Sequence, residues 1–381
     1  MSDLYRSAMH ARIAKLPQLP PDVPGEEDED EEDEVADSIG ALPSLSTNSP
    51  SSHLPRTPNP EYAPISGASY FSEAVQVDVP ASKLDVRVYY TPPQTTDGGA
   101  GSVMVCHHGA GFAGLSFALF AKEITRMSKG ELGVLSLDAR RHGKTRPTEG
   151  SSDEDLSLNI LVQDLYNLLR VVFPDASAAP SFLFVGHSMG GAVVVNVVPR
   201  LLEAEYRVSG VAVLDVVEGT ALDALPHMPS ILNSRPEGFD SVSAAIEWHI
   251  TAHQIRNITS ARVSVPSLIT PTPEPRPRGK RAFTWFTPLR TTGPYWEGWF
   301  KGLSTAFLAA RTARLLVLAG TDRLDRELMI GQMQGKFQMV VVPNTGHMLH
   351  EDDPLTLAQT LMEFWRRNER VLVGIKKVGD L

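Results

Sequence analysis

A serine that stands between glycines carries the clearest chemical signal in this sequence. The stretch "FLFVGHSMGGAVVVNVV" places Ser188 between Gly186 and Gly190, after one apolar run and before another. The two runs predict a buried strand followed by a helix, so the serine falls on the turn that joins them. On that turn its hydroxyl lies beside the positive end of the helix. The pattern indicates a nucleophile, and its alternative is a turn with a helix-capping serine.

A serine hydroxyl is a weak nucleophile and requires a general base. Among the eleven histidines, His347 stands in "PNTGHMLHEDDP", after the last expected strand and before the last expected helix. This position can reach the serine from the opposite side of a crevice, so we predict His347 as the base. His350 is the rival candidate and is expected to be a surface or loop partner, whereas His187 is expected to pack structurally.

Attack on an ester also requires donors for the oxyanion that forms. The glycine-rich stretch "HHGAGFAG", residues 107–114, follows an early expected strand. We predict that the backbone N–H groups of Ala110 and Met189 hold this charge, each worth about 3–4 kcal/mol in the transition state. The alternative is a plain glycine-rich turn.

Two aspartates could orient the imidazole of the base. Asp215 ends the strand in "VLDVVEG", and Asp322 follows the next strand in "LAGTDRLD". Both preserve the chain order serine, aspartate, histidine. The general position of the acid in hydrolases of this layout favours Asp322, so the residues alone leave the choice open.

An alternation of strands and helices must position these side chains. The alternation runs from about residue 100 to 216 and resumes at "ARLLVLAGTD", "KFQMVVVPNTGH" and the helix "PLTLAQTLMEFWRRN", while "EAVQVDV" and "KLDVRVYYT" read as an antiparallel pair. This pattern predicts an α/β class with a mostly parallel sheet and helices on both faces. A serine on a strand-to-helix turn of such a sheet is the nucleophile elbow of the α/β-hydrolase fold, which we therefore predict.

The interval between the two alternating blocks is too long for an ordinary crossover. We predict that residues 217–313 form a cap inserted over the strand ends, where such sheets bind ligands. Part of it reads as helix, and a Pro-rich basic part at about 266–282 is expected to be flexible. The whole hydrolase domain is predicted to span residues 70–370.

The first sixty residues have a different composition. Residues 1–60 combine nine consecutive acids at positions 26–34 with a Ser/Pro-rich stretch. Such sequence offers too little apolar surface to offset its ordering entropy, so we predict a disordered tail. Without these nine of the 45 acids, the chain nearly balances its 35 basic residues.

Composition excludes several classes of protein. No basic excess points to nucleic acid, no apolar run approaches the ~18–20 residues of a membrane span, and no signal peptide is evident. The single cysteine, Cys106, has no partner for a disulfide and is expected in a buried strand. A cytoplasmic or nuclear location follows. His249 and His253 have the spacing of a metal pair but lack a third ligand, so we expect a plain helix face and no metal or other cofactor.

Several stretches together closely resemble the protein phosphatase methylesterase family. They include "GHSMGGAVVV", "LDVVEGTALDAL", "IEWHI", "QIRNITSARVSVP", "YWEGWFKGLS" and "AGTDRLDRELMIGQMQGKFQMVVVPNTGHMLHED". The resemblance runs from about Tyr70 to Arg366, and "LDVVEGTALDAL" and "MIGQMQGKFQM" are its family-specific parts. It implies an α/β hydrolase that removes the methyl ester from the C-terminal leucine of the protein phosphatase 2A catalytic subunit, releases methanol and needs no cofactor.

The resemblance also assigns site residues. The family's nucleophile, acid and base map onto Ser188, Asp215 and His347, which favours Asp215 over Asp322. A carboxylate at the end of the apolar strand "GVAVLD" needs a buried partner, and His347 is a suitable one. The Pro-rich basic insert of this chain departs from the acidic insert of the family.

Two other functions stay open at this point. One is a general carboxylesterase or lipase-like hydrolase that acts on small esters. The other is a non-catalytic protein that binds and masks the phosphatase C-terminus, although the serine, aspartate and histidine needed for catalysis are all present. Epoxide hydrolases and dehalogenases of this fold are disfavoured because they need aspartate where Ser188 stands.

Overall fold

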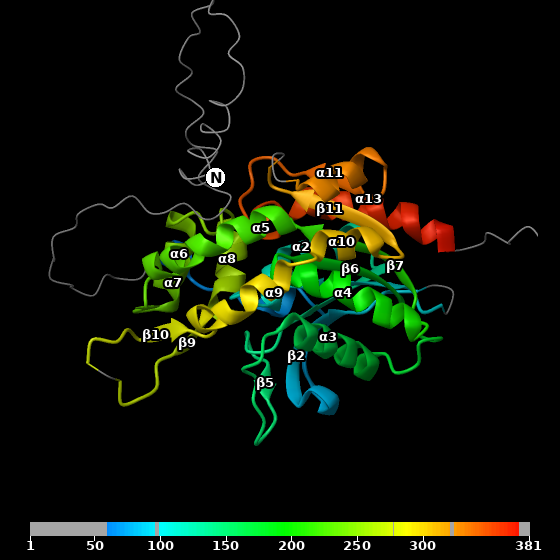
Figure 1. The fold of residues 1–381 in the computed structure, drawn as a ribbon. Helices are drawn as coiled ribbons and strands as arrows, with labels where there is room; N and C mark the ends of the chain where they lie inside the picture. The colour runs from blue at the N-terminus through cyan, green and yellow to red at the C-terminus, as the bar shows by residue number, and fades with distance from the viewer. Residues whose placement is uncertain (1–58, 96–98, 277, 321–323, 373–381) are drawn as a thin grey trace, which may run out of the picture.

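The computed structural model describes residues 59–95, 99–276, 278–320 and 324–372 (Figure 1). Its centre is a sheet in the order β1-β2-β4-β3-β6-β7-β11-β12, with β5 paired to β2. The strands are β1 Glu73–Val79, β2 Leu84–Thr91, β3 Ser102–His107, β4 Leu132–Leu137, β5 Arg146–Pro147, β6 Ser181–His187, β7 Val208–Leu214, β11 Ala313–Leu318 and β12 Gln338–Val341.

Most neighbouring strands of this sheet are parallel, and their register aligns the ends that carry the predicted site. The antiparallel pairs are β1 with β2, β2 with β4 and β2 with β5. Along the parallel part, His107 lies opposite Gly186 and His187 lies opposite Leu214. The residues that follow β3, β6 and β7 therefore meet at one edge, where sheets of this class bind ligands.

Helices cover both faces of the sheet and bury two apolar cores. On one face α3 and α4 pack with α10, and on the other α2 packs with α13. Strand β11 shows the two-residue period of a strand between two cores, with Leu316 and Leu318 on one side and Leu315 and Val317 on the other. The predicted fold class is thereby confirmed. The helices are α2 Ala118–Met127, α3 Leu158–Val172, α4 Met189–Glu203, α10 Leu303–Ala309, α11 Arg326–Met333, α12 Leu349–Asp352 and α13 Pro354–Leu372.

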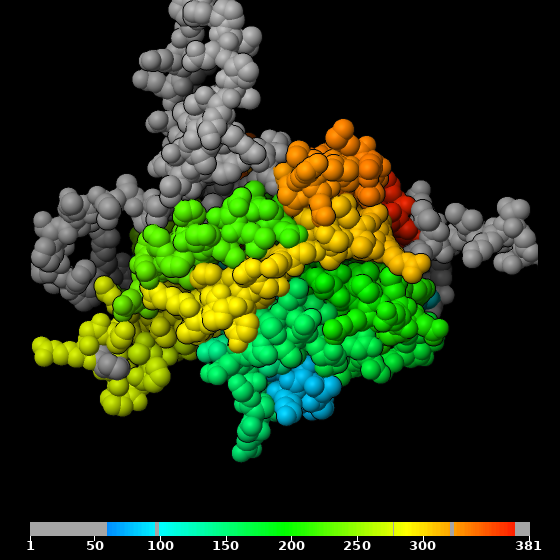
Figure 2. Space-filling view, in the orientation of Figure 1, coloured from blue at the N-terminus to red at the C-terminus, as the bar shows by residue number. Residues whose placement is uncertain are grey.

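Between β7 and β11 the chain leaves the sheet, in the interval for which a cap is predicted; we call residues 217–313 the cap segment. In Figure 1 helices α6 to α8 lie together at the left of the view, and α5 runs from them toward α11; Figure 2 shows these residues in light green beside the yellow residues that follow them. A third apolar core joins this segment to Ala113 and Met348, on the loops that follow β3 and β12 of the main sheet. Besides α10, the elements of the cap segment are α5 Glu218–Ala224, the 3₁₀ helix η6 Leu225–His227, α6 Met228–Ser234, β8 Gly238–Phe239, α7 Val242–Thr251, α8 Ile258–Ser264, the 3₁₀ helix η7 Val265–Ser267, β9 Ile269–Pro271, β10 Phe283–Trp285, the 3₁₀ helix η8 Leu289–Tyr295 and α9 Trp296–Phe300.

The cap segment contains a small sheet that the sequence pattern does not predict. Strands β8, β10 and β9 pair in that order, all antiparallel. Strand β9 lies inside residues 266–282, the Pro-rich part expected to be a flexible excursion. These strands are two or three residues long, too short to leave a periodic signal.

Two other predictions concern the N-terminal tail and membrane-spanning segments. The predicted N-terminal tail falls almost wholly outside the described residues. Within the described residues, none of the helices is long and apolar enough to cross a membrane.

Candidate active site

Ser188 stands on the turn between β6 and α4, in a conformation that side chains rarely adopt. Its φ is 51° and its ψ is −120°. A non-glycine residue at such angles costs free energy that the surrounding packing must supply. Glycine is required on both sides: a Cβ at Gly186 would lie 2.3 Å from the Gly190 carbonyl oxygen, and one at Gly190 would lie 2.2 Å from that of His107. The chain therefore turns sharply here and leaves Ser188 half-buried at the edge of the sheet.

The predicted oxyanion donors lie beside this serine. Met189 is the first residue of α4, where an N–H group has no intrahelical acceptor. Ala110 lies on the turn after β3, in the segment 108–114 that we call the oxyanion loop, and its N–H has no acceptor among the described residues. A Cβ at Gly109 would lie 3.2 Å from the Ser188 Cβ, so the loop packs directly against Ser188. Two N–H groups near one hydroxyl are able to stabilise an anion formed there.

Asp215 and His347 meet at this edge although 132 residues separate them in the chain. The Nδ1 of His347 lies 2.8 Å from the Oδ2 of Asp215. The aspartate side chain is fully buried, whereas that of His347 is 36% exposed. The second carboxylate oxygen, Oδ1, accepts the Ala319 N–H at 2.9 Å. A carboxylate partner makes Nδ1 the protonated nitrogen, which leaves Nε2 as the basic one.

The loop that carries His347 is hydrogen-bonded to His187, the residue before Ser188. His187 donates from Nε2 to the His347 carbonyl oxygen at 2.8 Å, and the two rings lie 4.6 Å apart. No hydrogen bond of the described residues joins the Ser188 hydroxyl to His347, and catalytic bonds of this kind often form only once substrate is bound. His187 is expected to pack structurally, and in the structure it supports the loop that carries His347.

The same loop is tied to the cap segment through two acidic residues that sequence reasoning missed. The Oε2 of Glu351 accepts hydroxyl hydrogen bonds from Ser260 and Ser264 of α8 at 2.8 and 2.7 Å. Asp352 accepts from the N–H groups of Arg256 and Gly346, both at 2.8 Å. The acidic residues that follow His347 in the sequence are the only indication of these hydrogen bonds, and they do not identify the bonding partners.

His350 and His249 are buried in the fold, and the second candidate acid lies outside the described residues. His350 is fully buried and stacks on Phe117 with ring centroids 4.4 Å apart, so the expectation of a surface or loop partner is wrong. His249 is buried against Trp248, and its Nδ1 lies 2.8 Å from the Ala245 carbonyl oxygen. Asp322 lies outside the described residues.

The described structure buries six histidines, and burial lowers the pKa of each because the charged imidazolium loses its hydration. The pKa falls to about 4 for His107 and His142. It falls to about 3 for His187 and His249. The pKa values of His108 and His350 are lowered as well.

We expect the free energy of unfolding to fall as the pH falls from 6.5 toward about 4. In this window the unfolded chain binds protons at these histidines and the folded chain does not, at about 1.4 kcal/mol per unmatched proton and pH unit. Asp138, Glu351 and Asp352 act in the opposite direction but are fewer: burial raises the pKa of the first to about 6 and of the second to about 8, and it raises that of the third as well. Urea unfolding followed by tryptophan fluorescence near pH 7, 6 and 5 measures the slope.

A Glu351→Gln variant provides the control for this prediction. Above pH 6.5 the wild-type protein is expected to lose stability up to about pH 8, because the unfolded chain ionises Glu351 while the folded chain keeps it protonated. The variant lacks that alkaline decline and keeps the acidic one. An unfolding free energy that does not change between pH 7 and 5 would contradict the account.

Comparison with known proteins shows which family this chain resembles. Residues 104–360 match the model of the alpha/beta hydrolase family. The chain is 47% identical over 346 residues to protein phosphatase methylesterase 1 of Cryptococcus neoformans var. neoformans serotype D (strain B-3501A), covering 84% of this chain and 82% of that protein. It is 48% identical over 301 residues to the protein of the same name from Aspergillus fumigatus, covering 77% and 70%.

Solved structures show the likeness of fold alone. E-2-(acetamidomethylene)succinate hydrolase superposes with a TM-score of 0.58 at 18% identity, over 77% of this chain and 99% of that one. The thioesterase domain from the curacin biosynthetic pathway superposes with a TM-score of 0.54 at 16% identity, over 76% and 98%. Both are hydrolases by name, and at these identities their substrates carry no weight for this chain.

Proposed function

This chain belongs to the protein phosphatase methylesterase family of α/β hydrolases, and from that premise we propose that it removes the methyl ester from the C-terminal leucine of the protein phosphatase 2A catalytic subunit. The products are methanol and a free leucine carboxylate. It is an esterase, and we assign the reaction to Ser188 as nucleophile, His347 as base and Asp215 as the acid that orients it.

One observation carries the assignment of these residues. The buried carboxylate of Asp215 lies 2.8 Å from Nδ1 of His347, at the edge of the sheet where Ser188 stands on its strained turn. The carboxylate and the imidazole meet there from elements far apart in the chain, beside the Ala110 and Met189 N–H groups, for which the described residues show no acceptor. This arrangement supports acyl transfer through a serine.

In the first half of the reaction, Nε2 of His347 takes the proton of the Ser188 hydroxyl as its oxygen attacks the ester carbonyl carbon. The carbonyl oxygen becomes an oxyanion held by the Ala110 and Met189 N–H groups. When the tetrahedral intermediate collapses, the C–O bond to the methoxy group breaks. The imidazolium gives its proton to the departing oxygen, and methanol leaves an acyl-serine.

In the second half, water loses a proton to His347 and attacks the acyl-serine. The same donors hold the second oxyanion, and the serine leaves with the proton from the imidazolium. Asp215 stays ionised throughout and stabilises the imidazolium of both half-reactions. The leaving group has one carbon, so recognition must come from the peptide side, and we assign it to the cap segment around residues 218–299 and to contacts with the phosphatase.

The test uses phosphatase 2A catalytic subunit whose C-terminal methyl ester carries a labelled methyl group. Methanol release is measured with p-nitrophenyl acetate hydrolysis in parallel. Release of labelled methanol with a saturable dependence on phosphatase concentration supports the proposal. Turnover of p-nitrophenyl acetate alone would identify a general carboxylesterase, and stable binding to the phosphatase with turnover of neither ester would identify a non-catalytic binding protein.

A further inference from the structure

Two buried histidines hold the peptide groups on either side of Ala110. His108 Nδ1 lies 2.8 Å from the Gly109 carbonyl oxygen, and His142 Nε2 lies 2.9 Å from the Gly111 nitrogen. The first contact fixes the peptide plane that contains the Ala110 N–H, because a peptide group is planar. The second fixes the plane that follows Ala110. The direction of the Ala110 N–H is therefore set by both rings.

The partners of these rings determine which nitrogen carries the proton. A carbonyl oxygen only accepts and a backbone N–H only donates. His108 therefore donates from Nδ1 to the Gly109 oxygen and accepts the Ala139 N–H at Nε2, 2.9 Å away. His142 donates from Nδ1 to the Arg140 oxygen at 2.7 Å and accepts the Gly111 N–H at Nε2. Each ring thus joins the oxyanion loop to residues 139–140.

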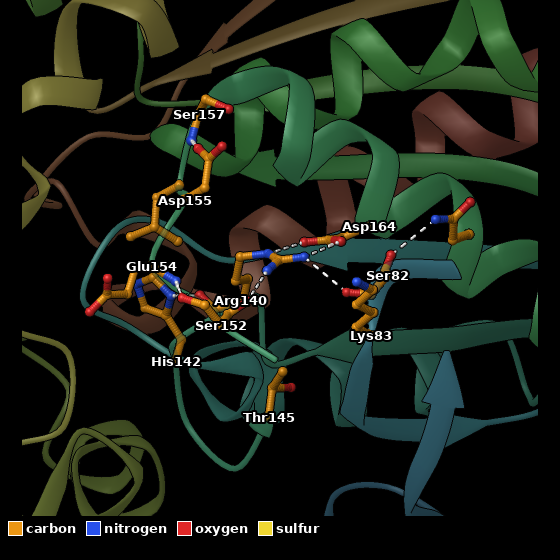
Figure 3. A network of polar contacts seen from close by, with 12 residues as sticks. Ser82, Lys83, Arg140, His142, Thr145, Ser152, Glu154, Asp155, Ser157 and Asp164 are labelled. Atoms are coloured by element: carbon orange, nitrogen blue, oxygen red, sulfur yellow. Dashed lines mark hydrogen bonds and ion pairs between the residues drawn. The ribbon is translucent and has the colours of Figure 1, made fainter. Parts of the chain in front are cut away.

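The far end of this linkage is anchored by a buried ion pair. Arg140 binds both carboxylate oxygens of Asp164 on α3, at 2.7 and 2.8 Å, as Figure 3 shows. Its other donors reach the carbonyl oxygens of Ser82 and Ser152, both at 3.2 Å. The guanidinium of Arg140 is thus bound by three residues, which restrains the segment whose carbonyl oxygen accepts from His142.

The oxyanion loop is also confined on the side of the cap segment, at a position where only glycine fits. Gly111 has a φ of +79°, in the region that favours glycine, and Leu289 of the cap segment lies where its Cβ would be. The rings of His108 and His142 lie 4.9 Å apart, so they pack on each other behind the loop. Both histidines are buried to 1% exposure or less, out of reach of a bound ester.

We propose that His108 and His142 are positioning residues, which aim the Ala110 N–H at the oxyanion through one bond each to the flanking peptide groups. The inference rests on the proposed function, since it assumes that Ala110 donates to the oxyanion. It assigns a role in transition-state stabilisation to two side chains that do not touch substrate. We call His108 and His142 the histidine clamp. Arg140 and Asp164 hold the segment to which the histidine clamp is bonded.

Asparagine and glutamine distinguish the two nitrogens of each ring. The amide of asparagine occupies the place of Nδ1, whereas the amide of glutamine reaches the place of Nε2. At His142 the contact with the oxyanion loop is made by Nε2, so His142→Gln keeps it and His142→Asn loses it. At His108 the contact is made by Nδ1, so His108→Asn keeps it and His108→Gln loses it.

The expected order of activity therefore inverts between the two positions. With p-nitrophenyl acetate as substrate, His142→Asn and His108→Gln should lower kcat by ~10–100-fold and leave KM within about twofold, because a misdirected donor weakens only the transition state. His142→Gln and His108→Asn should keep most of kcat. A trifluoromethyl ketone that forms an oxyanion on the serine should lose affinity by the same factor as kcat/KM falls.

A purely structural role would give a different result. It predicts losses that follow thermal stability, with the same order of asparagine and glutamine at both sites or with KM affected as much as kcat. Either result would overturn the proposal, and so would wild-type kcat in both disruptive variants. If one position fails to fold when substituted, the order within the other pair still decides. If the wild-type protein releases no methanol from the phosphatase but the variants still show the inverted order on p-nitrophenyl acetate, the proposed substrate is rejected and the role of the two histidines stands. If the wild-type protein hydrolyses neither ester, both proposals are overturned.

Discussion

Replacement of Ser188 by alanine should reduce kcat for ester hydrolysis by roughly 10⁶-fold, the size of effect that follows loss of a triad nucleophile. Without the hydroxyl no acyl-enzyme forms, and the base and the oxyanion donors have nothing to act on. The fold should persist, because alanine occupies no more space and the strained φ of 51° is already supported by the packing around the turn. Binding to the phosphatase should also persist, since the proposed contacts lie in the cap segment and at the rim.

The measurement compares hydrolysis of p-nitrophenyl acetate and of the methylated phosphatase in the two proteins. Ser181→Ala is a matched control, because Ser181 lies at the opposite end of the same strand and its hydroxyl has no hydrogen-bond partner among the described residues. The control should keep wild-type kcat. Labelling of Ser188→Ala by a serine-reactive fluorophosphonate as strong as that of wild type would remove Ser188 from the mechanism.

The parts of the site that the sequence predicts are those encoded by local pattern. Glycines at fixed spacing around Ser188 indicate the strained turn because the backbone approaches there leave no room for a Cβ. The alternation of elements predicts a parallel sheet, and a parallel sheet brings the ends of β3, β6 and β7 to one edge. The positions of the oxyanion loop and of Asp215 at that edge follow from this argument alone.

The parts that sequence reasoning misses depend on contacts between distant residues. The hydrogen bond from the Gly111 N–H to His142 spans 31 positions and exists because β3 and β4 are neighbours in the sheet, an order that the pattern does not specify. His350 is an example of the reverse error: its spacing after His347 suggests a partly exposed loop, yet α12 turns the ring inward onto Phe117. Tertiary packing decides both cases.

Asp215→Asn should lower kcat by about 10⁴-fold while the fold is kept, as for the equivalent change in serine proteases. The reason lies in the hydrogen bonds at the two carboxylate oxygens: Oδ1 accepts the Ala319 N–H at 2.9 Å, and Oδ2 lies 2.8 Å from His347 Nδ1. An asparagine that keeps its oxygen toward Ala319 presents its NH₂ group to His347. The imidazole must then accept at Nδ1 and carry its proton on Nε2, where it no longer serves as base for Ser188.

The opposite orientation of the asparagine amide is no better, because it sets an NH₂ group against the Ala319 N–H and leaves two donors facing each other in a buried place. The comparator is Asp322→Asn, the other acid that the chain order allows, and it should cost far less in kcat. Both variants are assayed on p-nitrophenyl acetate after their thermal unfolding has been compared with wild type. The reverse order of kcat would transfer the acid role to Asp322. The expected order follows from burial: a carboxylate with no exposed side chain at the end of an apolar strand is retained only where paired groups compensate its lost hydration, and His347 is one of those groups.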